Sequence, residues 1–128
     1  MTELIKTAID KIIHIAHDFY HVDKSEFALL KESGYFERHD QINENEIAEV
    51  LRMYPDLIAE WLQLSADRRC SSGRAIIRAD NEKYFVGHWP EGKDFEEIST
   101  NDGFYACAAF IKRHIESMRV TSITRLSK

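Results

Sequence analysis

The chain has 128 residues, of which 44% are hydrophobic and 30% charged, and its formal net charge at pH 7 is −5. This length fits one globular domain spanning residues 1–128, and the apolar content excludes an intrinsically disordered chain. No apolar run approaches the ~18 residues of a membrane-spanning helix, and the first residues lack the basic start and apolar core of a secretion signal. Two cysteines, Cys70 and Cys107, fit reduced thiols in a cytoplasmic protein better than a disulfide framework.

Helical periodicity dominates the first part of the chain. Apolar residues at spacings of one, three and four predict an amphipathic helix from about Glu3 to Tyr20. Asp23 followed by Glu26 has the spacing of a capping box, which predicts a short second helix that ends at Gly34. A polar loop is expected from there to Asn43.

The middle of the chain changes from a helical to a β pattern. Asn43 and Glu46 repeat the capping signature and precede a strongly amphipathic segment. Because Pro55 interrupts this segment, we expect a kink or two helices meeting there, with Pro55 in the first turn of the second. Two β-favouring runs, at 75–79 and 83–88, are separated by turn residues and predict a hairpin.

The C-terminal part is expected to be a last helix from about Asp102 to Met118. The tail from Val120 to Leu126 is the candidate for a third strand. The predicted fold class is therefore α+β: a helix-rich single domain with four to five helices and one β-hairpin, to which a third strand can be added.

The acidic residues are concentrated in two stretches. Residues 37–60 carry seven acids and two arginines, and residues 91–102 carry five acids and one lysine. Arg52 is expected to pair locally with Glu49 or Asp56, which leaves the exposed helical face mostly acidic. Such a surface repels nucleic-acid phosphates and speeds encounter with basic proteins. The same acids also keep a protein soluble, and composition alone does not separate the two roles.

Three histidines, His14, His17 and His21, share one face of the first predicted helix with Asp10. Two imidazoles one helical turn apart can chelate zinc or nickel, but this face is nearly opposite the apolar stripe and should be exposed to solvent. We therefore assign no metal and no other cofactor. The histidines are candidates for adventitious metal binding, or for part of a protein interface that weakens as they gain charge below pH ~6.5.

A short segment between the helical and β patterns, residues 67–74, is dense in polar chemistry. Five of its side chains, with the Gly73 backbone, could hold a phosphate or a carboxylate. They are Arg68, Arg69, Ser71, Ser72 and Arg74. It lacks the glycines and lysine of a phosphate-binding loop. We favour a structural role, in which Asp67 pairs with an arginine and Gly73 turns the chain into the strand. Cys70 lies beside Arg69, but no base can be placed near it, so no catalytic residue is assigned.

In general form the chain resembles the small cytosolic immunity proteins that bacteria pair with secreted toxins of polymorphic or contact-dependent systems. It shares with them a compact acidic α+β domain, no catalytic signature and no export signal. The run from Trp61 through residues 67–73 into an apolar strand is similar to helix-to-strand junctions in such proteins, although Arg74 stands where an aromatic residue often follows the glycine. The resemblance implies a cytoplasmic, non-enzymatic protein that occludes the active site or surface of a cognate toxin domain, often a basic nuclease.

The resemblance also implies where the toxin would bind, because acidic side chains would stand in for nucleic-acid phosphates. The candidate contact residues form two groups, Glu46, Glu49, Asp56 and Glu60 on the helical face and Glu91, Asp94, Glu96 and Glu97 in the second acidic stretch. Exposed aromatic residues are expected to be the anchors of such an interface, with Tyr35, Phe36 and Tyr105 as examples. Two alternatives stay open: a small anion-binding module or enzyme built around residues 68–74, and an interaction protein without a toxin partner.

Overall fold

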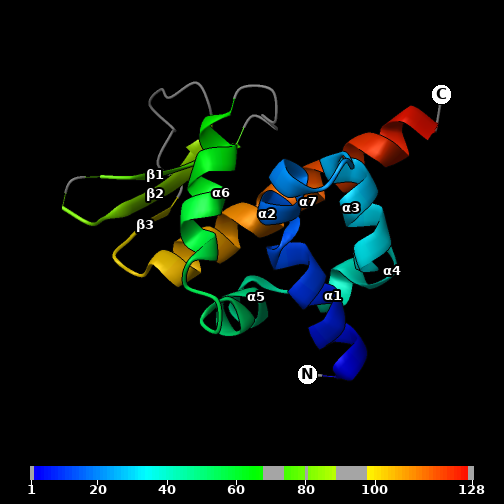
Figure 1. Ribbon diagram of the computed structural model, residues 1–128, viewed down its shortest axis with the longest axis horizontal. Coiled ribbons are helices and arrows are strands. Elements are labelled where there is room, and N and C mark those ends of the chain that lie inside the picture. The colour runs from blue at the N-terminus through cyan, green and yellow to red at the C-terminus, as the bar shows by residue number, and fades with distance from the viewer. Residues whose placement is uncertain (1, 68–73, 80, 89–97, 127–128) are drawn as a thin grey trace.

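The computed structural model describes residues 2–67, 74–79, 81–88 and 98–126. Within those ranges it contains seven α-helices, one short 3-10 helix and a three-stranded antiparallel sheet (Figure 1). The predicted α+β class is present, but the expectation of four to five helices is wrong. One predicted helix is divided in two at His14 and a predicted loop is helical, whereas two helices meeting near Pro55 were among the expectations.

The first division falls at His14, between α1 (Glu3–Ile13) and α2 (Ile15–His21). The sequence has neither glycine nor proline at this point. The indole N–H of Trp61, a fully buried side chain, donates a hydrogen bond of 2.9 Å to the Ile13 carbonyl. A carbonyl at the end of α1 is thus satisfied from a distant part of the chain, which makes an interruption here tolerable.

The next helix, α3 (Glu26–Ser33), is shorter at its start than the predicted capping box implied. Its N-cap is Ser25 rather than Asp23, because the Ser25 hydroxyl accepts a hydrogen bond from the helix backbone at 3.1 Å. It ends as predicted at Gly34, whose φ of 88° lies in the left-handed region that glycine adopts without strain.

The segment predicted as a polar loop is helical instead. It forms α4 (Tyr35–Arg38) and the 3-10 helix η1 (His39–Gln41). The reason is Tyr35, which is completely buried and ties this segment to the core. Tyr35 is therefore excluded as an exposed interface anchor.

The amphipathic middle segment is divided into α5 (Glu44–Leu51) and α6 (Leu57–Ala66). The predicted cap at Asn43 is confirmed: its side chain accepts a hydrogen bond of 2.9 Å from the Glu46 N–H. Pro55 lies in the turn between the two helices rather than in the first turn of α6. This turn faces solvent and becomes important for the site described below.

The predicted hairpin is confirmed as β1 (Arg74–Arg78) and β2 (Tyr84–His88), which pair in antiparallel register. The third strand is β3 (Ile98–Thr100), which pairs with the other edge of β2. The candidate strand in the tail is wrong, because residues 120–126 continue the last helix, α7 (Gly103–Leu126). After Gly103 the sequence contains no glycine or proline, so nothing local ends the helix at Met118.

α7 is the element on which the other layers pack. It runs the length of the molecule, with the sheet and α6 beside its first half and α3 near its second half (Figure 1). Six consecutive residues, 106–111, are buried, so side chains cover the helix on every side in this stretch. Within the described residues, no helix is at once long enough and apolar enough to cross a membrane.

We expect Trp61→Phe to lower the free energy of unfolding by about 2 kcal/mol, because the change leaves the Ile13 carbonyl without its partner and opens a void in the core. Urea unfolding followed by far-ultraviolet circular dichroism measures this. Leu4→Ala is the control: Leu4 is 64% exposed, so its loss should change stability by less than ~0.5 kcal/mol. Equal effects of the two substitutions would contradict the role given to Trp61.

Candidate functional site

The structure brings together two features that the sequence placed far apart, the histidine face and the acidic helical face. The Nδ1 atom of His17 lies 2.9 Å from both carboxylate oxygens of Glu60, which links α2 to α6. The ring of His21 stacks on that of His17, with centroids 4.1 Å apart and planes inclined by 15°. The hydrogen bond to Glu60 raises the pKa of His17. Protonated His17 therefore neutralises Glu60, one of the four acids expected to contact a partner on this face.

The histidine row continues to the turn between α5 and α6. His14 meets the ring of Tyr54 edge-on, at a centroid distance of 4.9 Å and an interplanar angle of 75°. On the same side, the negative charge of Asp10 beside Tyr54 raises the pKa of its hydroxyl. Tyr54 thus contacts the N-terminal part of the chain twice, through its ring at His14 and through its hydroxyl at Asp10.

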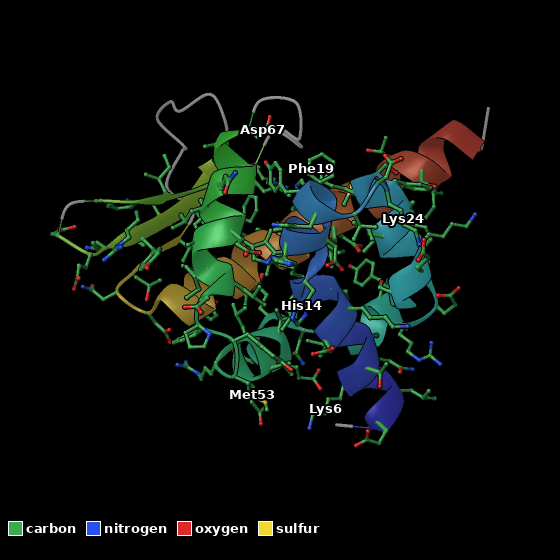
Figure 2. The ribbon with its side chains drawn as sticks, viewed as in Figure 1. Lys6, His14, Phe19, Lys24, Met53 and Asp67 are labelled. Atoms are coloured by element: carbon green, nitrogen blue, oxygen red, sulfur yellow. The ribbon has the colours of Figure 1, made fainter. Side chains whose placement is uncertain are left out.

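A groove of about 300 Å³ opens between α1 and this turn. Its walls are formed by residues of both elements: Glu3, Lys6, Thr7, Asp10, Val50, Met53 and Tyr54. Met53 is 65% exposed and Tyr54 37%, and Figure 2 shows Met53 and Lys6 at the same end of the molecule. Single exposed apolar side chains are common on protein surfaces, but these two adjoin each other at the edge of a groove, which makes this place a candidate interaction surface.

The four acids predicted on the helical face do not line this groove, and they differ in how far they are neutralised. Arg52 does not pair with Glu49 or Asp56 as expected; its guanidinium donates a hydrogen bond of 2.8 Å to Asp102 and lies over the Phe104 ring. Glu49 and Asp56 are exposed and form no ion pair with any other residue in the described ranges. Within those ranges no basic side chain neutralises their charges.

The fourth acid of the helical group, Glu46, lies in the first turn of α5 and is partly exposed. There its negative charge interacts favourably with the positive end of the helix dipole. Of the four acids predicted on this face, Glu49 and Asp56 are thus the two fully exposed charges, while Glu46 and Glu60 have partners or roles within the fold.

The histidines are not arranged as metal ligands. The Nδ1 atoms of His14 and His21 each lie 2.7 Å from a backbone carbonyl oxygen, and that of His17 is taken by Glu60. Nitrogen lone pairs lie in the plane of the imidazole ring, so the stacked His17 and His21 rings do not direct them at a common point. In the part of the chain that the structure describes, no group of three or more His, Cys, Asp or Glu side chains could hold a metal ion.

Two predicted groups lie outside the described residues. These are most of the candidate anion-binding segment, Arg68, Arg69, Cys70, Ser71, Ser72 and Gly73, and the second acidic group, Glu91, Asp94, Glu96 and Glu97. Arg74 is described and opens β1, where it is partly buried. Asp67 is described too, and its carboxylate accepts a hydrogen bond of 2.8 Å from the Tyr20 hydroxyl, which ties the end of α6 to α2.

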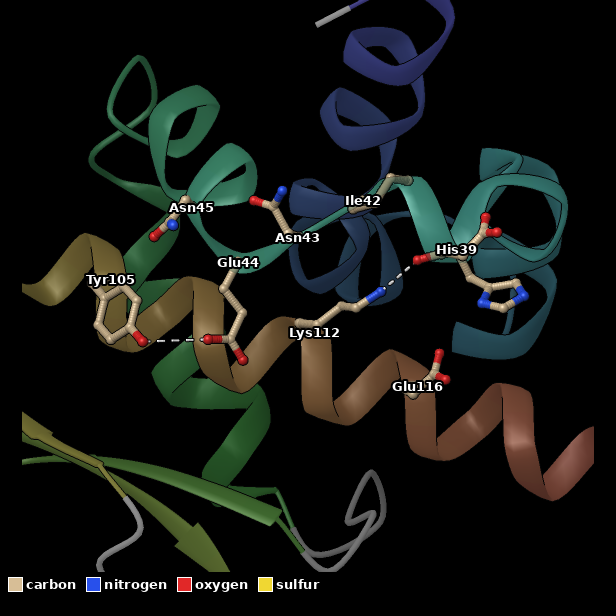
Figure 3. Close-up of a pocket in the computed structure, with 9 residues that line it drawn as sticks. His39, Ile42, Asn43, Glu44, Asn45, Tyr105, Lys112 and Glu116 are labelled. Carbon is tan, nitrogen blue, oxygen red and sulfur yellow. Dashed lines mark hydrogen bonds between the residues drawn. The ribbon is translucent and has the colours of Figure 1, made fainter.

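A second hollow, of about 510 Å³, was not foreseen from the sequence (Figure 3). It lies between η1, the start of α5 and α7, and its lining is polar: His39, Asp40, Ile42, Asn43, Glu44, Asn45, Tyr105, Lys112 and Glu116. The Lys112 ammonium crosses it to donate hydrogen bonds to the His39 carbonyl at 2.8 Å and the Tyr35 hydroxyl at 2.9 Å. Residues so distant in the chain leave no local signal that could have predicted the contact.

Two charged groups of this hollow, Lys112 and Glu116, are joined through the Tyr35 hydroxyl. The Tyr35 hydroxyl donates to Glu116, and Arg119 pairs with the same carboxylate at 2.6 Å. Mainly because of Arg119, the pKa of Glu116 falls to about 2, whereas burial lowers the pKa of Lys112 and raises that of Tyr35. The network joins α4 and η1 to α7, so its chemistry is that of a structural anchor.

Comparison of the chain with known protein families, curated protein sequences and solved structures finds no match. The resemblance to immunity proteins therefore stays a prediction, and the geometry of the surface around Met53 and Tyr54 carries the functional argument.

We expect Glu60→Gln to lower the pKa of His17 toward its ordinary 6.5, because it removes the carboxylate that favours the imidazolium. Because the pKa of His17 is higher in the folded than in the unfolded protein, its protonation stabilises the fold fully below pH ~6.5. This stabilisation is lost as pH rises through the folded-state pKa. The stability difference from wild type should thus be larger at about pH 5.5 than at about pH 8. NMR titration of the His17 ring and urea unfolding at both pH values measure this.

Glu37→Gln is the matched control for this prediction, because Glu37 is an exposed glutamate on α4. It should leave both the His17 titration and the pH dependence of stability as in wild type. A His17 titration unchanged by Glu60→Gln would contradict the pairing.

We expect Tyr35→Phe to lower the free energy of unfolding by about 1–2 kcal/mol, because Lys112 and Glu116 both lose a hydrogen-bond partner. It should also raise the pKa of Glu116 above its value of about 2. Because the pKa of Glu116 is lower in the folded than in the unfolded protein, its carboxylate stabilises the fold above pH ~4.5 and this stabilisation is lost as pH falls. Tyr35→Phe should therefore lose less stability than wild type on acidification.

Urea unfolding at neutral and acidic pH measures both effects of Tyr35→Phe. Tyr105→Phe is the control, since the Tyr105 hydroxyl makes only a 3.4 Å contact with Glu44. An acid dependence identical in the two variants would show that Tyr35 does not support Glu116.

Proposed function

We propose that this chain is a cytoplasmic, non-enzymatic binding protein that neutralises a cognate bacterial toxin domain by covering its surface. One observation carries the proposal. Exposed Met53 and Tyr54 stand at the α5–α6 turn beside Glu49 and Asp56, whose charges are uncompensated within the described ranges. A basic domain, such as a nuclease that binds nucleic acid, is the complementary partner.

The apolar and the charged side chains of this surface contribute differently to binding. Apolar and aromatic side chains at the centre of an interface supply most of the affinity, and charges at its edge mainly set the association rate and the orientation. Met53 suits the central position because its unbranched side chain adapts to the partner's surface. Glu49 and Asp56 are exposed, so they act at long range and their effect should fall with added salt.

The cysteine in the described ranges is unsuited to nucleophilic catalysis. Cys107 is completely buried in α7, and burial raises its pKa, which keeps the thiol protonated. A thiol in this state is a poor nucleophile.

The test is co-expression with the toxin candidate, the C-terminal domain of a large secreted protein encoded beside this chain. We expect an equimolar complex and rescue of growth. Charge reversal at two positions, Glu49→Lys with Asp56→Lys, should slow association by about tenfold at low salt and weaken its salt dependence. Stopped-flow association rates at several salt concentrations measure this.

The matched control is Asp23→Lys with Glu37→Lys, which reverses the same number of exposed acids outside the proposed surface. Its association rate should fall much less than that of the Glu49 and Asp56 variant. Absence of a complex and of growth rescue would overturn the proposal, and equal slowing in both variants would remove this surface from it.

A further inference from the structure

The groove beside Met53 has a more specific chemistry than its acidic surroundings. One wall, from α1, presents the carboxylates of Glu3 and Asp10 and the ammonium of Lys6. The other wall presents the exposed ring of Tyr54. Asp10 and Tyr54 line the same groove, and the Asp10 carboxylate lies at the hydroxyl end of the tyrosine, where it raises the pKa of the hydroxyl.

We propose that this groove binds an arginine side chain of the basic partner, with the guanidinium stacked on the Tyr54 ring and donating to the Asp10 carboxylate, and with an adjoining apolar residue on Met53. The inference rests on the proposed function, because it names the anchor by which the toxin domain would be held. The groove lies at the turn that also presents Met53, so one short segment of the partner reaches both.

Arginine fits this arrangement better than lysine. A guanidinium is planar, so it can stack on an aromatic ring and at the same time donate two parallel hydrogen bonds to a carboxylate. An ammonium is a compact and strongly hydrated charge that matches neither geometry. The orientation of Tyr54 is already fixed, because His14 packs edge-on against its ring at 4.9 Å. The ring therefore loses little conformational entropy on binding.

Lys6 supplies a test of the sign of the ligand charge. It lines the same groove, where its positive charge opposes a cationic ligand and would favour an anionic one. Removing it should therefore strengthen the binding of arginine, whereas the same substitution would weaken the binding of a carboxylate or phosphate.

The experiment is a heteronuclear NMR titration of the whole chain with the peptide acetyl-Leu-Arg-Leu-amide. We expect shifts at Asp10, Val50 and Tyr54. The matched peptide with citrulline, which keeps the shape of arginine without its charge, should bind about tenfold more weakly. Asp10→Asn and Tyr54→Ala should each weaken arginine-peptide binding by a similar factor, Lys6→Ala should strengthen it, and Glu37→Gln should leave it unchanged.

Several outcomes would overturn the inference. These are equal binding of the arginine and citrulline peptides, shifts centred elsewhere, weaker binding by Lys6→Ala, or dimerisation of the chain through this groove in analytical ultracentrifugation. The toxin complex separates the inference from the proposed function. If Asp10→Asn and Tyr54→Ala still bind the toxin as wild type does, while charge reversal at Glu49 and Asp56 slows binding, the inference is overturned and the proposed function stands. If the arginine peptide binds in the groove but no toxin complex forms, the proposed function is overturned and the groove remains an arginine-binding site.

Discussion

The fold depends on one buried helix. α7 packs against all three strands of the sheet and against α5 and α6, and its small buried residues, Ala106, Cys107, Ala108 and Ala109, let these elements approach it closely. A helix covered on all sides can carry a polar side chain only where a partner satisfies it. In α7 the buried polar side chain is His114, whose Nε2 atom lies 2.7 Å from the Glu26 carboxylate. Such a pair adds little net stability, but loss of either partner leaves a buried polar group unsatisfied, so it specifies where α3 meets α7.

The same packing places the candidate surface. α5 and α6 rest on α7, which holds the turn between them at the surface and leaves Met53 and Tyr54 exposed. α1 packs against α5 and is fixed at its end by the hydrogen bond from Trp61, so both walls of the groove belong to elements anchored in the core. A groove with fixed walls requires little reorganisation when a ligand enters, which favours affinity for a ligand of matching shape.

Features that depend on neighbouring residues could be predicted from the sequence, and features that depend on distant contacts could not. The cap at Asn43, the end of α3 at Gly34 and the β1–β2 hairpin each follow from a short pattern. The break at His14 has no such pattern, because its stabilising partner, Trp61, lies 48 residues away. In the same way, the helical turn at Tyr35 is stabilised by burial against the core and by Lys112 and Glu116, which are 77 and 81 residues distant. A sequence read locally assigns such segments to the wrong element.

For the candidate site, the sequence indicated the right residue types but not which charges remain available to a partner. Glu60 meets His17 across 43 residues, and Arg52 meets Asp102 across 50. The first contact pairs an acid of this face and the second pairs a base, although all four side chains stay partly exposed. Glu49 and Asp56 remain as exposed acids without an ion pair in the described ranges, and they flank the turn that carries the exposed Met53. Since exposed charges contribute mainly to the rate of encounter, the strength of any complex must come from the apolar and aromatic contacts that this rearrangement leaves at its centre.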